Sequence, residues 1–371
     1  MKRRCENEKK YKKILTVIIV CIMFVIILIA GYEIKENVRI NKIVKSHKTE
    51  QNAKQNDVVR SNDKNNSEHI TTAVQQIMIG TMCSNYNNAL HTLLDIKNAG
   101  YESIELNDFM IHKSSMLVKL MTKFSGMPIG NGGKLDWPKL IKESGLKVIS
   151  LHSDLGSIEN DPKAIADEAK IFGTNTVVIT GMYKFDYSSL DDVEKLAKRL
   201  DQAGKALSKK GIRLLYHNHN CELQKVTSEK TAYDVLIEET DPAYVNFEFD
   251  SYWMTDGGAN VPALMKKLGS RMKLWHINDR GCTKSGPYMT PILEENATEL
   301  GHGNMDLDTL SAIAIKNGVE GVILETHKNW VDKDPIKSLQ VSAKYMQEKF
   351  GDKIIEIQED NDIEPFSEND D

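Results

Sequence analysis

The stretch GIRLLYHNHNCE, residues 211–222, decides the fold of this 371-residue chain. Its apolar half, which ends at Leu215, is typical of a buried parallel strand, and the run then turns polar at His217. Side chains alternate between the two faces of a strand, so Leu215, His217 and His219 share one face. We therefore expect a strand that ends in two imidazoles, both of which project into the mouth of a barrel.

Three later stretches repeat this pattern of an apolar body with a reactive last residue. VNFEFD ends at Asp250, MKLWH ends at His276, and GVILE ends at Glu325. Imidazole nitrogen and carboxylate oxygen are the ligands that a borderline divalent cation prefers. The sequence therefore predicts a metal site made by His217 together with these three residues.

Strand-like and helical patterns alternate throughout residues 75–351, which we interpret as one domain. The first four strands are expected at 77–81, 103–106, 147–152 and 175–180, and helices at 89–97, 137–144, 190–209 and 335–350. Eight strands alternating with helices predict an α/β fold of the (β/α)₈ TIM-barrel type. The active site of such a barrel lies at the carboxyl ends of its strands. Two long glycine-rich stretches, 125–136 and 280–304, are predicted to be lids or substrate walls.

The N-terminal part is expected to hold this barrel at a membrane. Residues 1–13 are a basic tail, 14–31 are apolar enough for one transmembrane signal-anchor helix, and 32–74 are predicted to be a disordered linker. The positive-inside rule then leaves the N-terminus in the cytoplasm and displays the barrel outside the cell membrane. A cleaved signal peptide is the competing interpretation. The acidic residues 352–371 are expected to form a disordered tail.

The net charge limits the binding partners of this chain, and its cysteine content limits the disulfides that it can form. The net charge is −5 and the pI is near 6.1, so no nucleic acid is expected as a partner. Cys83, Cys221 and Cys282 lie on the outer side of the membrane in this topology, and three cysteines cannot all pair. A disulfide framework is therefore not expected, although one bridge from Cys221 to Cys282 or Cys83 stays open.

Six motifs carry a resemblance: GYESIEL from Gly100, YHNHNCE from Tyr216, FEFDSYW from Phe247, LWHINDRG from Leu274, GHGNMD from Gly301 and VILE from Val322. With them the chain resembles the xylose isomerase-like barrel superfamily of sugar phosphate isomerases and epimerases. The resemblance implies one divalent metal ion, Mn²⁺, Co²⁺, Mg²⁺ or Zn²⁺, held by residues of strands five to eight. Those positions fall on His217, Asp250, His276 and Glu325. The family's usual first ligand is a glutamate, and His217 replaces it here, as in the branch with a YHNH signature.

The resemblance also implies a catalytic base. Family epimerases move the proton with their two metal-binding glutamates, of which this chain keeps Glu325. Glu325 is therefore the predicted base, with His219, Glu222 or His152 as candidate catalytic partners. A helix cap is the ordinary alternative for Asp250 and Glu325, and a salt bridge is the alternative for Glu222.

Other polar and aromatic residues near the strand ends are predicted to bind substrate: His152, Glu105 and Trp253. A loop hydrogen bond for His152, a salt bridge for Glu105 and a core position for Trp253 are the alternatives. Glu248 shares a strand face with Asp250 and is predicted to support the site from the layer below.

The expected function is that of a metal-dependent isomerase or epimerase, which acts on a sugar or sugar-like hydroxycarbonyl compound through an enediolate. A keto-sugar lyase or dehydratase would need the same intermediate and only one base. A surface carbohydrate-binding barrel without catalysis is a further alternative. A phosphodiester-cleaving relative of endonuclease IV is disfavoured, because this chain offers fewer metal ligands than that multi-zinc site requires.

Overall fold

Residues 69–114, 119, 120, 130, 132–282 and 295–351 are described by the structure, a computed structural model. Eight parallel strands close into a barrel in the order β1-β10-β7-β6-β5-β4-β3-β2. The strands are β1 (Thr71–Gln75), β2 (Ser103–Asn107), β3 (Lys147–Ser153), β4 (Thr176–Ile179), β5 (Arg213–His217), β6 (Val245–Asp250), β7 (Met272–Ile277) and β10 (Gly321–Leu324). This confirms the predicted TIM barrel.

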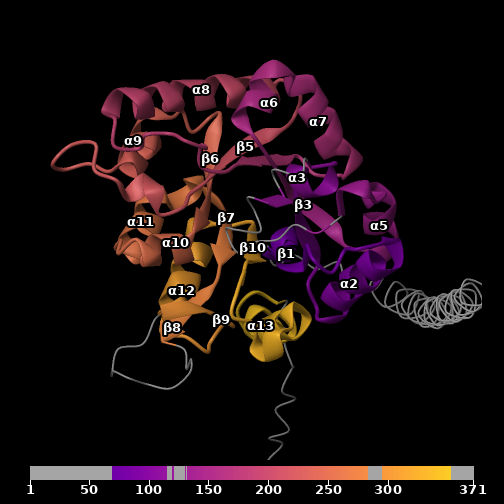
Figure 1. Ribbon diagram of the computed structural model, residues 1–371. Helices are drawn as coiled ribbons and strands as arrows, with labels where there is room; N and C mark the ends of the chain where they lie inside the picture. Colours follow the sequence, from indigo (N-terminus) through magenta and orange to yellow (C-terminus); the bar gives the residue numbers. More distant parts are fainter. Residues whose placement is uncertain (1–68, 115–118, 121–129, 131, 283–294, 352–371) are drawn as a thin grey trace, which may run out of the picture.

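Helices surround the strands on the outside (Figure 1). The longer ones are α2 (Tyr86–Asn98), α5 (Trp137–Ser144), α7 (Pro162–Ile171), α8 (Leu190–Ser208), α9 (Ala232–Glu239), α11 (Val261–Leu268), α12 (Leu307–Asn317) and α13 (Pro335–Phe350). Their starts follow from side-chain caps: Ser189 accepts the amide of Asp192 at α8, and Asp136 accepts that of Lys139 at α5. Gly145 ends α5 in the left-handed conformation, with φ of 71°.

Period-two alternation along the strands creates two separate cores. One lies inside the barrel and contains Ala73, Val178, Leu215, Leu274 and Ile323. The other lies between strands and helices, and Tyr216 belongs to it although its neighbour Leu215 belongs to the first. The next inward position after Leu215 is His217, so the apolar layer inside the barrel fixes which strand-end residues face the barrel axis.

The predicted position of the first strand is wrong. Residues 77–81 were expected to form it, but β1 is Thr71–Gln75, which pairs with β10 and β2. The apolar run after it forms a 3₁₀ turn, η2 (Gln76–Ile79), because the side chain of Gln75 accepts the Ile77 amide and ends the strand. Met78 and Ile79 are buried from that turn. Most of β1 therefore lies within residues 32–74, which were assigned to the linker.

The predicted wall at 280–304 contains a hairpin. It consists of β8 (Asp279–Cys282) and β9 (Glu295–Thr298), which pair antiparallel outside the barrel. Asp279 fixes the chain that returns from this hairpin, because its carboxylate accepts the amides of Gly301 and Gly303 at 3.0 and 2.9 Å. Within the described residues Cys83, Cys221 and Cys282 are free, so the one bridge left open by the sequence does not form.

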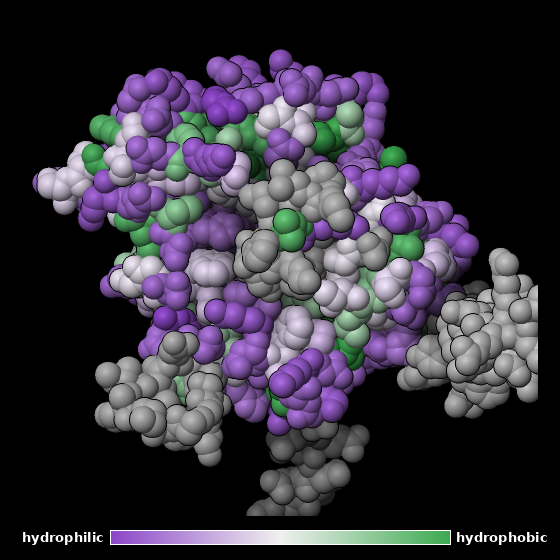
Figure 2. All heavy atoms as spheres, in the orientation of Figure 1, coloured by the Kyte–Doolittle hydropathy of each residue, from purple (hydrophilic) through white to green (hydrophobic). Residues whose placement is uncertain are grey.

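The membrane prediction rests on residues that the structure does not describe. The basic tail, the anchor at 14–31 and the acidic tail at 352–371 lie outside the described residues. Among the helices that are described, each is too short or too polar to cross a bilayer. The face seen in Figure 2 is mostly hydrophilic, with small scattered hydrophobic spots over the described part. The membrane anchor therefore stays a prediction.

Candidate metal centre

A polar layer lies directly above the apolar layer inside the barrel. Two residues after Leu215, Leu274 and Ile323, the inward positions are occupied by His217, His276 and Glu325. Strand β6 adds Asp250, which is 1% exposed, at its last position. These are the four residues predicted as metal ligands, and the barrel brings them to one end of its axis.

The four side chains converge closely enough to bind one ion. One ligand atom from each of His217, Asp250, His276 and Glu325 lies within 4.8 Å of the others. His276 Nδ1 is 3.1 Å from Glu325 Oε2 and 3.8 Å from Asp250 Oδ2. Two imidazole nitrogens and two carboxylate oxygens are a donor set that suits a borderline divalent cation. The residues present therefore fit a metal ion.

Hydrogen bonds between side chains and backbone hold the two candidate carboxylate ligands, Asp250 and Glu325, in place. Asp250 caps the short helix α10 (Ser251–Asp256), because its Oδ1 accepts the Trp253 amide at 2.8 Å. Asn218 ties β5 to β6 by bonding both the N–H and the C=O of Asp250, each at 3.0 Å. Asn278 in turn donates to the backbone oxygen of Glu325 at 2.6 Å. Asp250 therefore caps a helix, which was the ordinary alternative for this residue, and its carboxylate also belongs to the cluster.

Two fully buried carboxylates lie behind the histidines. Glu105 Oε2 is 2.6 Å from His276 Nε2, and Glu248 Oε2 is 3.0 Å from His217 Nδ1. His152 Nε2 lies between these carboxylates, 3.0 Å from Glu105 and 3.1 Å from Glu248. Each of the two candidate ligand histidines therefore turns one nitrogen to a buried glutamate and leaves the other toward the cluster, an arrangement typical of metal-binding histidines.

Matches to known proteins agree with this geometry. The family model described as xylose isomerase-like TIM barrel matches residues 93–349, more than half of the chain. The chain belongs to the xylose isomerase-like TIM barrel family. The predicted resemblance to this family and its sugar phosphate isomerases and epimerases is thereby confirmed.

Several known proteins are similar to the chain over most of the barrel. An inosose dehydratase of Clostridium beijerinckii is 24% identical over 219 residues, which cover 57% of this chain and 67% of the relative. An inosose dehydratase of Clostridium tetani is 25% identical, and the match spans only 55% of its length. A sugar phosphate isomerase/epimerase from Parabacteroides distasonis superposes with a TM-score of 0.59 at 19% identity, over 77% of this chain and 96% of its own.

Zinc binding is documented for another barrel of this fold. The IolI protein, whose crystal structure has a bound zinc atom, superposes with a TM-score of 0.53 at 16% identity, over 76% of this chain and 98% of its own. At this identity the likeness shows the fold alone.

Two of the predicted catalytic partners of Glu325 lie on the loop that follows β5 of this family barrel. His219 is partly buried, with its ring 5.0 Å from that of His217 and 5.8 Å from that of Trp253. Glu222 is fully buried below the loop, where it accepts hydrogen bonds from Tyr216 Oη at 2.7 Å and from the His219 amide at 3.0 Å. Its contacts hold the loop that carries His219.

The predicted substrate-binding residues fall into two groups. Trp253 is half-buried at the start of α10, and its ring stacks on His327 with centroids 5.2 Å apart. Glu105 and His152 are buried and contact one another and the ligand histidines, as described above. The structure therefore places Trp253 beside His219 as an aromatic wall, whereas Glu105 and His152 lie beneath the metal cluster.

Sequence reasoning missed three residues of this site. Asn218, Asn278 and His327 follow strand ends in the contexts HNH, HIN and ETH, respectively, but such residues are common in loops. The two asparagines could have been found from their positions, because Asn218 directly follows His217 and Asn278 lies two residues after His276. A side chain there is well placed to bond the backbone of the next strand, as both asparagines do.

Burial and neighbouring charges shift the pKa values of the residues in and beside the cluster in opposite directions. Burial lowers the pKa of His217 well below its ordinary value, and burial lowers that of His219 to about 4. Burial also opposes the charge on His276, but the carboxylates of Glu248, Glu105 and Glu325 outweigh it and raise the pKa of His276. Burial and the neighbouring Glu325 raise the pKa of Asp250. In the metal-free protein, His276 and Asp250 therefore keep their protons to a higher pH than the free side chains do.

Metal binding is expected to release protons. A metal competes with the protons on His276 and Asp250, whose pKa values are raised, so affinity should increase as the pH rises. We expect about one or more protons to be released per ion, with affinity rising roughly tenfold per pH unit for each proton released. Calorimetric titration with Co²⁺ in buffers of different ionisation enthalpy measures the release. Asp250→Asn should release fewer protons, and release of none by the native protein would contradict the expectation.

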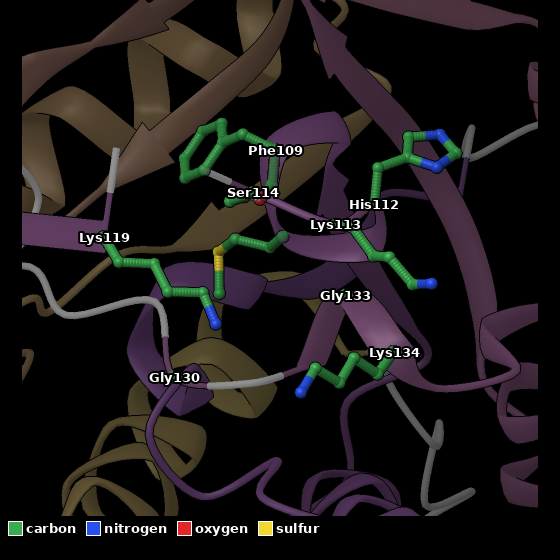
Figure 3. A pocket seen from close by; sticks show the side chains of 9 residues that line it. Phe109, His112, Lys113, Ser114, Lys119, Gly130, Gly133 and Lys134 are labelled. Carbon is green, nitrogen blue, oxygen red and sulfur yellow. Dashed lines mark hydrogen bonds between the residues drawn. The ribbon is translucent and has the colours of Figure 1, made fainter. Parts of the chain in front are cut away.

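A separate hollow lies beside the strand end of β2. It has a volume of about 170 Å³ and is lined by Phe109, Met110, His112, Lys113, Ser114, Lys119, Gly130, Gly133 and Lys134. Figure 3 shows its three lysines around the opening. An acidic group near it, Asp108, His112 and Glu168, could also hold an ion, but two of these residues are half-buried and His112 is exposed. Neither feature includes a residue of the metal cluster.

Proposed function

We propose that this chain is a metal-dependent enzyme that moves a proton beside the carbonyl of a sugar-like hydroxycarbonyl substrate, and so isomerises or epimerises it. The observation that carries the proposal is the convergence of His217, Asp250, His276 and Glu325 at the carboxyl end of the barrel. That end is where enzymes of this architecture act. The sugar phosphate isomerase/epimerase among the structural relatives supports the same reaction class.

The four converging residues would hold the metal. When bound, a divalent cation supplies a Lewis acid that polarises a carbonyl and stabilises the negative charge that develops on its oxygen. The mixed nitrogen and oxygen donors suit zinc, the metal that the IolI protein binds, and they also suit manganese or cobalt.

Glu325 is proposed as the base because, of the four candidate ligands, its side chain is the most exposed at the mouth of the barrel. Its side chain is 13% exposed, whereas those of Asp250 and His276 are 2% and 0% exposed. Burial opposes the charge on Glu325, but His276 lowers the pKa of Glu325 below its ordinary value, so the carboxylate is ionised and has no proton to lose before it acts as a base.

The aromatic wall is proposed to orient the substrate. Trp253 and His219 lie side by side beside the cluster, and flat apolar rings pack well against the C–H faces of sugars. Burial keeps His219 neutral at physiological pH, so it can exchange a proton with a substrate hydroxyl. Glu222 is proposed to act through its bond to the His219 amide, and Glu105 and His152 through the ligand histidines.

Dehydration of a keto-sugar or keto-polyol is the second candidate. Glu325 would take the proton next to the carbonyl, and the C–O bond on the following carbon would break to release water. Two observations favour it: His217 replaces the second carboxylate base, and the curated relatives reported above are inosose dehydratases.

The test begins with the full chain. Elemental analysis should find about one transition metal per chain, and His217→Ala should lose or weaken it. Ketohexoses, their phosphates and inosose are then incubated with the metal-loaded protein in D₂O. Deuterium next to the carbonyl with no loss of water indicates an isomerase or epimerase, and a product lighter by one water indicates a dehydratase.

A negative result would be equally clear. If neither protein holds metal after Mn²⁺, Co²⁺ or Zn²⁺ is added, the catalytic proposal fails. A non-catalytic carbohydrate-binding barrel would then be the better interpretation.

A further inference from the structure

The inward carboxylate of Glu248 has an uneven set of contacts. Its Oε2 lies 3.0 Å from His217 Nδ1, 3.1 Å from His152 Nε2 and 3.2 Å from His276 Nε2. Its other oxygen, Oε1, is buried and has no hydrogen-bond partner among the described residues. A buried carboxylate whose contacts served only its own hydrogen bonding would accept hydrogen bonds at both of its oxygens. Glu248 is therefore placed by the three imidazoles that surround one of its oxygens.

This contact decides which nitrogen of His217 is free. Burial and the nearby Glu105 raise the pKa of Glu248 to about 7. In its ionised form this carboxylate only accepts hydrogen bonds, so His217 Nδ1 then carries the hydrogen. The lone pair of a neutral imidazole then lies on Nε2, the nitrogen left for a metal. Without Glu248, His217 could adopt either tautomer and could rotate about its side-chain bonds. Glu248 also lies 3.2 Å from His276 Nε2, but that nitrogen has a shorter contact, of 2.6 Å, with Glu105.

We propose that Glu248 is a positioning residue, which acts with His217 as one unit in place of a single carboxylate ligand. The inference rests on the proposed metal site. The imidazole provides the donor atom, and the carboxylate behind it fixes the tautomer and adds negative charge near the cation. The two positions are then interdependent, because a carboxylate at residue 217 would lie against Glu248 in a dry environment. Two buried carboxylates in contact repel one another unless one is neutralised.

The test is a double-mutant cycle on the full chain with Co²⁺ as the probe. Glu248→Gln should bind Co²⁺ about 10- to 100-fold more weakly, since that is the usual effect of losing the partner behind a ligand histidine. His217→Glu should weaken binding at least as much. The double variant His217→Glu/Glu248→Gln should bind at least about tenfold more tightly than His217→Glu alone, because the repulsion is gone.

Two further readouts separate positioning from general stability. Nitrogen-15 NMR of the metal-free protein should show the Nδ1–H tautomer of His217, and Glu248→Gln should populate the other tautomer. The visible spectrum of bound Co²⁺ should change in Glu248→Gln. The matched control is Glu299→Gln, another buried carboxylate, which accepts the Val331 amide and belongs to neither group of side chains that could hold a metal in the barrel. Its Co²⁺ affinity and spectrum should equal those of the native protein.

Four outcomes would overturn the inference. The first is unchanged Co²⁺ affinity in Glu248→Gln. The second is a double variant whose losses simply add. The third is an Nε2–H tautomer of His217 in the native protein, whether or not metal binds. The fourth is two equivalents of Co²⁺ in the native protein and one in Glu248→Gln, because Glu248 would then be a ligand in a second site with His152, His217 and His276. A native protein with the Nδ1–H tautomer but no affinity for metal would instead refute the proposed function.

Discussion

Replacing Asp250 by asparagine is expected to lower metal affinity by more than about a hundredfold and to leave the barrel folded. Losing a partner behind a ligand already costs about 10- to 100-fold, so loss of a charged ligand should cost more. Asparagine keeps an oxygen that can accept the Trp253 amide, so the cap of α10 survives. Burial and Glu325 both oppose the ionised form of Asp250, so the metal-free variant should be as stable as the native protein.

Asp250→Ala is the matched comparison. It removes the ligand and the cap together, so its free energy of unfolding should fall by about a further 1 kcal/mol. Co²⁺ titration against a competing chelator gives the affinities, and thermal unfolding of the metal-free proteins gives the stabilities. If Asp250→Asn unfolds the barrel or still binds Co²⁺ as tightly as the native protein, Asp250 is a structural cap and the ligand assignment is wrong.

Replacing Glu325 by glutamine is expected to reduce turnover by about 10²- to 10⁴-fold, the usual contribution of a general base. Glutamine has nearly the same shape and leaves the backbone oxygen that Asn278 bonds, so the strand end should not move. An amide cannot accept the proton, so exchange of deuterium into the substrate should be lost with it. The assay is run at saturating metal, because weaker metal binding alone would otherwise lower the rate.

Glu299→Gln serves again as the control for a buried carboxylate outside the cluster, and its turnover should equal that of the native protein. Residual turnover in Glu325→Gln within a few-fold of the native value, with metal bound, would mean that another group takes the proton. His219 is then the next candidate, since its ring lies beside that of His217.

Strand and helix positions could be predicted where sequence periodicity was strong. The expected bounds 137–144, 335–350 and 245–250 agree with α5, α13 and β6. β1 was missed because its five residues, TTAVQ, are short and follow a polar segment, while the more apolar IMI run beside it is helical. In this case the pairing of β1 with β10 and β2, which local sequence does not reveal, decided the strand.

Contacts between residues that are far apart in the sequence could not be predicted from the sequence. Glu105 and His276 are 171 residues apart and 2.6 Å from each other, and nothing local distinguishes Glu105 from a surface carboxylate. Glu105 was therefore predicted to bind substrate, although barrel closure buries it beneath the cluster. The stacking of Trp253 on His327 likewise depends on how two strand ends meet.

By itself the sequence determined the barrel and the four converging strand ends, because alternation of apolar and polar residues dictates which side chains face inward once strands pair. It also determined the replacement of a carboxylate by His217. Only the tertiary structure decided which nitrogen of each histidine faces the metal site. That choice depends on Glu105 and Glu248, which belong to other strands and reach the histidines only when the barrel closes and excludes water from the space between them.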